Sequence, residues 1–186
     1  MGFHHVAIAT RDLEATHRFY TEAMGFALVK VVAAPSPDDT GQPTANWARH
    51  VFYDTGNGEL FAVWDLHDPE LDHFDPAIST GLGLPIWTNH IAFAATSLND
   101  LVACRDRWLA QDIDVLEIDH GWGTSIYTVD PNGVMVEWCT TTATFSAADR
   151  EEAAALLTAD HPPLETPPQP TIHKAGHKAG VAGPVS

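Results

Sequence analysis

The chain has 186 residues, of which 45% are hydrophobic, and its 25 acidic and nine basic side chains give a formal net charge of −16 at pH 7. This length and composition suit one globular domain or two small modules with a buried core. The acidic balance excludes nucleic acid and anionic membranes as expected partners, because both select basic surfaces.

Cysteine usage indicates the compartment. Cys104 and Cys139 are too few for a disulfide framework in a chain of this length. The sequence also has no secretory signal pattern and no apolar run near the ~18 residues that a membrane span needs. We therefore expect a soluble cytoplasmic protein.

The first part of the chain predicts the order β-α-β-β-β. The predicted elements are strand 3–10, a helix from Asp12 to a stop at Gly25, strand 27–33, a loop from Pro35 to Thr44, and a hairpin of 51–54 and 60–64 across Asn57-Gly58. The second part repeats this order. Its predicted elements are strand 89–95, a helix from Leu98 to Leu109, and strands 115–118, 125–129 and 134–139, the last two joined by Asp130-Pro131-Asn132-Gly133.

The repeat predicts an α+β fold of two βαβββ modules, at 1–65 and 87–142, that pair into a metal-binding cleft. The proline- and glycine-containing connector 66–86 is either a lid or a plain linker. In residues 143–186 a capping box at Ser146 opens a short helix to Leu157. The Pro-rich tail that follows is expected to be flexible or to lie on a neighbouring subunit, and its His173 and His177 are expected to have no role.

The two copies differ at the positions that suggest a metal site. One copy opens with His5 and the other with His90, and four residues after each turn glycine stand Ala62 and Glu137. A carboxylate in the middle of an apolar strand costs roughly several kcal/mol unless it has a partner. Each residue alone would be explained as a core histidine or a salt-bridged acid. Together, His5, His90 and Glu137 form a candidate metal site.

Two histidines and one carboxylate leave open coordination positions on one side of a metal ion. This pattern suits non-haem Fe(II), with Mn(II) or another divalent ion as alternatives. A closed set of four ligands would have indicated a structural metal instead. His4 precedes His5, and strand alternation is expected to send it to the opposite face.

These residues resemble the vicinal oxygen chelate superfamily over about residues 3–140, a superfamily that holds glyoxalase I, extradiol dioxygenases, and fosfomycin- and bleomycin-resistance proteins. The resemblance implies paired modules, a metal held by His5, His90 and Glu137, and a homodimer. Glyoxalase I typically carries a glutamate where this chain has Ala62, so the site pattern departs from that branch.

A second stretch is similar to type I extradiol dioxygenases. It runs from Ile118-Asp119-His120 through Ile126-Tyr127 to Asp130-Pro131-Asn132-Gly133 and Glu137. The resemblance implies that His120 and Tyr127 hydrogen-bond the substrate and oxygen intermediates and assist proton transfer. It also implies a further base near the end of the first module, where His67 and His73 are the candidates.

The first hypothesis is therefore an Fe(II)-dependent dioxygenase that uses O₂ to cleave a small catechol-like aromatic substrate. The alternative is a glyoxalase-like isomerase or epimerase, or a thiol transferase, that uses a divalent metal and no oxygen. A third hypothesis is a ligand-binding resistance protein without enzymatic activity. The intact set of His5, His90 and Glu137 counts against it.

Overall fold

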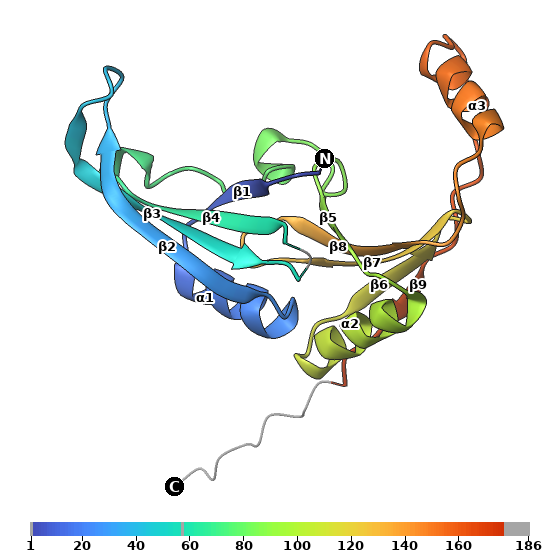
Figure 1. Ribbon diagram of the computed structural model, residues 1–186, viewed down its shortest axis with the longest axis horizontal. Helices are drawn as coiled ribbons and strands as arrows, with labels where there is room; N and C mark the ends of the chain where they lie inside the picture. The colour runs from blue at the N-terminus through green and yellow to red at the C-terminus, as the bar shows by residue number, and fades with distance from the viewer. Residues whose placement is uncertain (1, 57, 177–186) are drawn as a thin grey trace, which may run out of the picture. The chain divides into compact units, whose positions relative to one another are not determined.

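A computed structural model describes residues 2–56 and 58–176 (Figure 1), so Asn57 of the predicted turn and His177 of the tail lie outside the described residues. The α+β fold class is confirmed. One sheet has four strands in the order β1-β4-β3-β2, and the other has five in the order β5-β8-β7-β6-β9. The described residues separate into two compact units, one within 2–93 with 128–137 and the other within 94–127 with 138–176. No described helix is long and apolar enough to cross a membrane.

The strands of the first sheet are β1 (His5–Thr10), β2 (Ala27–Pro37), β3 (Pro43–Asp54) and β4 (Leu60–His67). β1 pairs in parallel with β4, whereas β3 is antiparallel to both of its neighbours. β2 and β3 are longer than predicted. Their pairing continues to Pro37 and Pro43, beyond a shift in the strand register between Pro35 and Pro37. They form the long ribbon visible in Figure 1. An edge strand tolerates proline because its outer N–H groups have no ladder partner.

A short helical segment links β1 to β2. It consists of α1 (Leu13–Arg18) and a π-helical turn, η1 (Phe19–Ala23). As predicted, Asp12 caps the helix by accepting a hydrogen bond from the Ala15 N–H at 2.9 Å. Tyr20 of η1 is fully buried, and its ring lies 4.3 Å from that of Phe61 on β4. This contact identifies the face of the first sheet that α1 and η1 cover.

The second copy of the pattern has the predicted element order. Its elements are β5 (Ile91–Ala94), α2 (Leu98–Ala110), β6 (Val115–Asp119), β7 (Gly123–Val129) and β8 (Met135–Thr141). Ser97 begins α2 by accepting a hydrogen bond from the Asp100 N–H at 3.2 Å. Trp108 and Leu101 bury the inner face of this helix.

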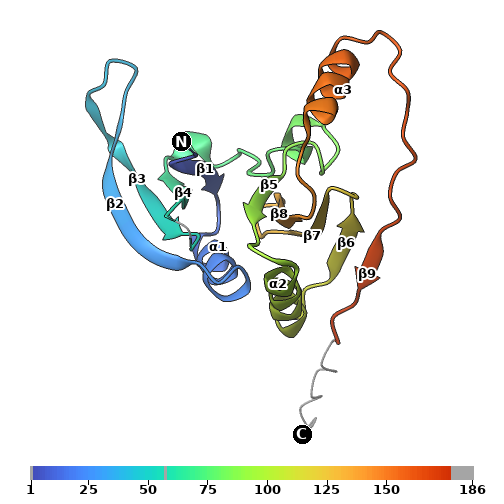
Figure 2. The same cartoon turned by 45° about the vertical axis from the view of Figure 1, so that its right-hand side comes forward.

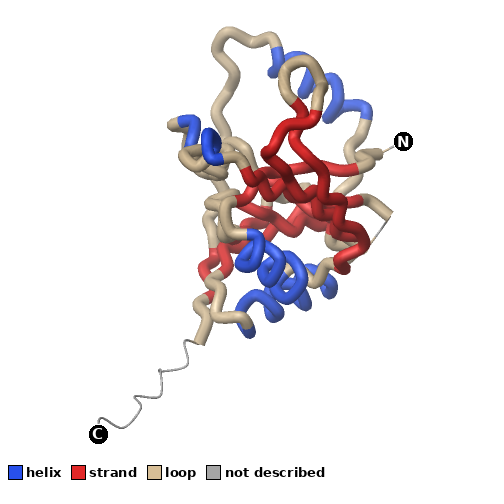
Figure 3. Tube along the Cα trace, turned by 90° about the vertical axis from the view of Figure 1, so that its left-hand side faces the viewer, coloured by secondary structure: helices blue, strands red, loops and turns tan. Residues whose placement is uncertain are grey.

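The connector between the copies contains two single helical turns, η2 (Pro69–Leu71) and η3 (Thr80–Leu82) (Figure 3). The residues between these two turns contact other parts of the chain. Ala77 is buried, and a Cβ added at Gly133 would lie 3.0 Å from the Ala77 Cβ. The Ser79 hydroxyl accepts a hydrogen bond from the Asn89 N–H at 2.8 Å. The connector is therefore fixed at Ala77 and Ser79.

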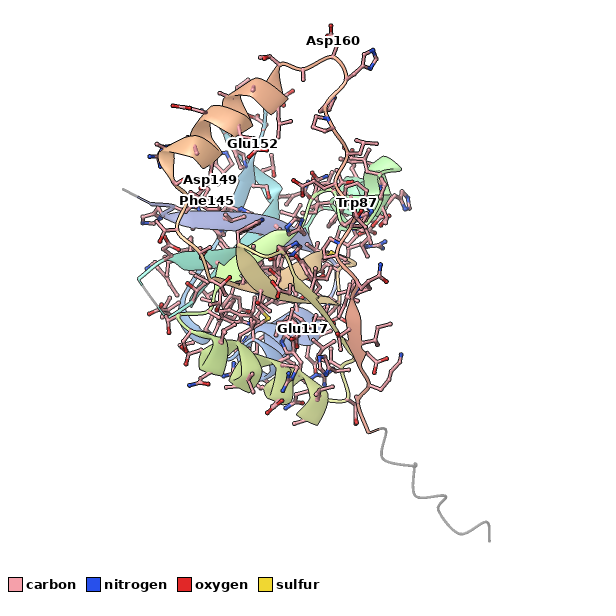
Figure 4. The ribbon with its side chains drawn as sticks, turned by 90° about the vertical axis from the view of Figure 1, so that its right-hand side faces the viewer. Trp87, Glu117, Phe145, Asp149, Glu152 and Asp160 are labelled. Carbon is pink, nitrogen blue, oxygen red and sulfur yellow. The ribbon has the colours of Figure 1, made fainter. Side chains whose placement is uncertain are left out.

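The C-terminal region holds α3 (Ala147–Leu157) and a short strand, β9 (Thr171–His173). The predicted capping box at Ser146 is present, but no residue of α3 is buried. β9 pairs antiparallel with β6 (Figure 2), at a place where a flexible tail was expected. His173 contacts Glu117 of β6, labelled in Figure 4, at 2.9 Å, and Lys174 contacts Asp114 at 2.6 Å. These contacts attach the tail to β6. In this position β9 pairs with backbone groups that would otherwise be unpaired at the edge of β6.

A buried carboxylate fixes the turn between β7 and β8. Asp130 accepts hydrogen bonds from the backbone N–H groups of Asn132 and Val134 at 2.8 and 2.9 Å. It also accepts one from the Tyr20 hydroxyl at 2.9 Å. Burial and the neighbouring Asp130 charge raise the pKa of Tyr20 well above its ordinary value, so this hydroxyl remains a donor. The turn is thereby tied to η1.

Replacing Tyr20 by Phe tests the hydrogen bond between Tyr20 and Asp130. The change removes a buried donor to a charged acceptor, so we expect the free energy of unfolding to fall by about 1.5–3 kcal/mol in urea titrations. Tyr53→Phe is the matched control. Its hydroxyl lies 3.2 Å from the His17 imidazole, without a carboxylate, and should cost only about 1 kcal/mol. Equal losses in the two variants would contradict the role given to Asp130.

Candidate metal site

The closest contact between predicted ligands joins His90 to Glu137. His90 precedes β5, Glu137 lies on β8, and these two strands are neighbours in the sheet. The His90 Nε2 lies 3.0 Å from the Glu137 Oε2, and the Glu137 side chain is only 6% exposed. The carboxylate that the sequence placed in an apolar strand is therefore buried against an imidazole.

The other ring nitrogen of His90 also has a partner. The His90 Nδ1 lies 2.9 Å from the main-chain carbonyl oxygen of Trp87, a residue labelled in Figure 4. A carbonyl oxygen only accepts, so the Nδ1 carries a hydrogen, and the Nε2 either donates to the carboxylate from the protonated ring or has a lone pair for a metal in the neutral ring. A histidine that binds a metal usually donates its other N–H to a carbonyl or carboxylate in this way. His90 and Glu137 therefore fit two ligands of a divalent ion.

His5 does not join this pair. Its Nδ1 lies 2.8 Å from that of His4, and its ring is 5.9 Å from that of His50 on β3. Among residues 2–56 and 58–176, no three His, Cys, Asp or Glu side chains are grouped so that they could hold a metal ion. The structure thus brings together two of the three predicted ligands.

Strand register defines the side of the first sheet on which His5 lies. His5 pairs with Leu60 on the parallel strand β4, and Ala62 pairs with Phe52 on β3. Paired residues point to the same side of a sheet, so these residues define what we call the His5 face, opposite the one that α1 covers. His90 precedes β5 of the other sheet and lines a hollow of about 260 Å³ with Val6 and Phe61 of the α1 side and Leu60 of the His5 face.

The His5 face carries a larger cavity of about 1030 Å³. Its lining residues come from β1 to β4 and from the residue just before β1, and they include His4, Ala48, His50, Phe52, Trp64 and Leu66. His4 was expected on the opposite face. That expectation is wrong, because β1 begins at His5 and the alternation of side chains does not extend to His4. Burial, and secondarily the His5 charge, lowers the pKa of His50. The sequence analysis missed His50 because it began this strand at residue 51.

His67 lies at the end of β4 and on the α1 side of the sheet. The Nε2 contacts the Asp65 carboxylate at 2.9 Å, and its ring stacks on Trp47 with centroids 3.7 Å apart. Arg49 donates to the same carboxylate at 2.7 Å. These contacts hold His67 away from the His5 face. His73, the other candidate base, lies beyond η2 in the connector.

His120 and Tyr127, predicted to act together, are in direct contact. The His120 Nε2 lies 3.0 Å from the Tyr127 hydroxyl oxygen, and both side chains are partly exposed. β7 carries Tyr127 opposite Leu116 of β6, and His120 follows β6, so a hairpin brings them together. The His120 ring also stacks on Trp122 at 5.7 Å. An imidazole and a phenol in contact can pass a proton between them.

Comparison with known proteins identifies the family of this chain. The model of the Glyoxalase/Bleomycin resistance protein/Dioxygenase superfamily matches residues 2–138. The chain belongs to this superfamily. Comparison with curated proteins finds no match.

Solved structures of this superfamily have a similar fold. A glyoxylase/bleomycin resistance protein/dioxygenase domain from Frankia sp. EAN1pec is 18% identical, with a TM-score of 0.54, covering 78% of this chain and 95% of that chain. The fosfomycin resistance protein FosX from Listeria monocytogenes is 17% identical, with a TM-score of 0.50, covering 81% and 98%. A lactoylglutathione lyase from Agrobacterium tumefaciens is 20% identical, with a TM-score of 0.49, covering 75% and 92%. At these identities the likeness concerns the fold alone.

The His90–Glu137 contact predicts a specific loss of metal binding. Glu137→Ala should weaken Mn(II) binding, measured by calorimetry, by more than the about 10- to 100-fold that loss of an outer partner costs. Glu117→Ala is the matched control. Glu117 also contacts a histidine Nε2, at 2.9 Å, but its side chain is 28% exposed, and its loss should leave Mn(II) binding unchanged. Tight binding retained by Glu137→Ala would show that Glu137 is no ligand.

Proposed function

We propose that the protein is a metal-dependent dioxygenase that holds non-haem Fe(II) with His5, His90 and Glu137 and cleaves a catechol-like ring. The observation that carries the proposal is the His90–Glu137 contact. A buried carboxylate lies 3.0 Å from the imidazole Nε2, while the Trp87 carbonyl contacts the other ring nitrogen. A divalent ion bound by both groups would stabilise the buried carboxylate.

The reaction needs no external reductant. Breaking the carbon–carbon bond beside the two ring hydroxyls and adding both atoms of O₂ gives one aldehyde or ketone and one carboxylate. A bound Fe(II) would supply a template and a Lewis acid for the two reactants. The three proposed ligands leave positions open for a substrate, because Ala62 has no donor atom where a glutamate would fill one.

His120 and Tyr127 support the ring-cleaving branch of the proposal. Their 3.0 Å contact joins a phenol to an imidazole, and a substrate hydroxyl beside them could lose its proton to this pair. In the proposal His120 accepts and returns the proton, and Tyr127 orients the substrate oxygen. His67 is left out, because Asp65 and Trp47 hold it on the α1 side of the first sheet.

The same proton relay also supports the alternative of an isomerase, epimerase or thiol transferase. Such an enzyme moves a proton or activates a nucleophile beside a divalent ion and consumes no oxygen. Oxygen consumption therefore separates the two functions. A homodimer is part of both proposals, because no third His, Cys, Asp or Glu among the described residues is grouped with His90 and Glu137 to complete a metal site within one chain. In a dimer, the His5 of one copy can complete the His90–Glu137 pair of the other.

Oxygen uptake by anaerobically Fe(II)-loaded protein tests the proposed reaction. We expect stoichiometric uptake with at least one member of a catechol panel and a yellow ring-opened product, and none with His5→Ala. Tyr127→Phe should lower kcat by about a hundredfold while iron remains bound. Tyr53→Phe, which changes a hydroxyl on β3, should retain full activity. An iron-loaded protein that consumes no oxygen but isomerises an α-hydroxy carbonyl adduct would favour the alternative.

Mixing two inactive variants tests whether a second copy supplies His5. His5→Ala and Glu137→Ala should each lack tight Mn(II) binding. After unfolding and refolding together, half of the dimers are mixed, and each mixed dimer regains one intact site. Bound Mn(II) should therefore recover to about a quarter of the wild-type level. Recovery near zero would mean that His5 completes the site within its own chain.

A further inference from the structure

An imidazole nitrogen without a partner marks the cavity on the His5 face. The His50 Nε2 is shielded from solvent and has no hydrogen-bond partner among the described residues. His50 lies on β3, opposite Trp64 of β4, and lines the cavity of about 1030 Å³. Buried polar atoms in folded proteins are almost always hydrogen-bonded, so an unpaired one points to a group that is absent.

Aromatic rings surround this nitrogen. The His50 ring stacks on Trp64, with centroids 3.9 Å apart and planes 11° apart, and lies 4.0 Å from the Phe52 ring. Trp64 remains 38% exposed. The ring cluster therefore has an open side from which a flat molecule could stack on it.

The remaining wall of the cavity is mostly apolar, with alanine, valine, leucine and proline side chains from all four strands. Its other polar lining residues are His4, Lys30 and Ser36. Among the described residues no Asp or Glu lines it, although the chain has 25 of them. The volume is at the upper end of the range for small-molecule sites, about 300–1,000 Å³. An aromatic molecule with very few polar groups suits such a wall.

We propose that this cavity binds the aromatic ring system of the substrate and that His50 determines specificity by hydrogen-bonding a ring hydroxyl through its Nε2. This inference rests on the proposed function, because it takes the His5 face as the substrate side of the site. A hydroxyl both donates and accepts, so it pairs with the Nε2 in either tautomer of His50. The ring would stack beside Trp64 and Phe52. The substrate class is thus a hydroxylated polycyclic or aryl-substituted aromatic compound, larger than a single ring.

Binding of two naphthalenes to metal-free protein tests this role. The probes are 2-naphthol and 2-methylnaphthalene, which have similar size and shape but differ in the hydroxyl. We expect wild-type protein, treated with EDTA, to bind both in equilibrium dialysis. His50→Phe keeps a ring against Trp64 and removes the nitrogen. It should shift the affinity ratio of the two probes by about fivefold against 2-naphthol.

Two further variants guard against indirect effects. His67→Phe is the matched control, because His67 also stacks on a tryptophan, Trp47, but on the other side of the sheet. It should leave the ratio unchanged. His50→Gln retains a hydrogen-bonding group and should keep part of the preference for 2-naphthol. A ratio that is equal in wild-type protein and His50→Phe would overturn the proposal.

Two other outcomes would also overturn it. One is the absence of any binding below millimolar probe. The other is binding that disappears at protein concentrations where sedimentation shows a dimer, which would assign the cavity to a second copy. Because the assay contains neither metal nor oxygen, it can succeed when oxygen uptake fails. A failed dioxygenase assay and a failed aromatic site are therefore distinguished.

Discussion

The geometry of the candidate metal site depends on the hydrogen bonds of one carboxylate. Asp130 accepts from Tyr20, from the backbone N–H groups of Asn132 and Val134, and from the Asn132 side chain. These bonds set the point at which the chain turns into β8, with Gly133 at φ 76°. Side chains alternate along a strand, so a shift of one residue here would turn Glu137 away from His90. The position of the candidate ligand Glu137 thus depends on a turn that contains no candidate ligand.

Comparison of two similar contacts shows why burial matters for the site. Glu117 and Glu137 each approach a histidine Nε2, at 2.9 and 3.0 Å. Glu117 is 28% exposed and also contacts Arg105, so its charge is already neutralised by solvent and by a cation. Glu137 is 6% exposed, and the other ring nitrogen of its histidine contacts the Trp87 carbonyl. Identical residue types therefore form a surface contact in one case and a buried candidate ligand pair in the other.

Sequence reasoning predicted what depends on local pattern. The internal repeat, the cap at Asp12 and the turn at Asp130 gave the element order, and the placement of Glu137 on an apolar strand predicted its burial. Long-range contacts were not predictable. The pairing of β9 with β6 joins residues more than fifty positions apart. The contact of His90 with the Trp87 carbonyl spans only three positions, but it depends on the turn that the connector makes there. His50 was missed because the predicted strand began at residue 51, whereas β3 begins at Pro43.

The short strand β9 has a consequence for how the protein behaves in crowded solution. β6 would be the outer strand of its sheet without β9, and its backbone groups would then be available to any other extended chain. The contact of His173 with Glu117 and the ion pair of Lys174 with Asp114 hold β9 in place at the end of a long exposed segment. After proteolysis within residues 158–170, only three residue pairs with β6 and the side-chain contacts would hold β9 in place. Loss of the C-terminal strand would then favour aggregation of otherwise intact molecules.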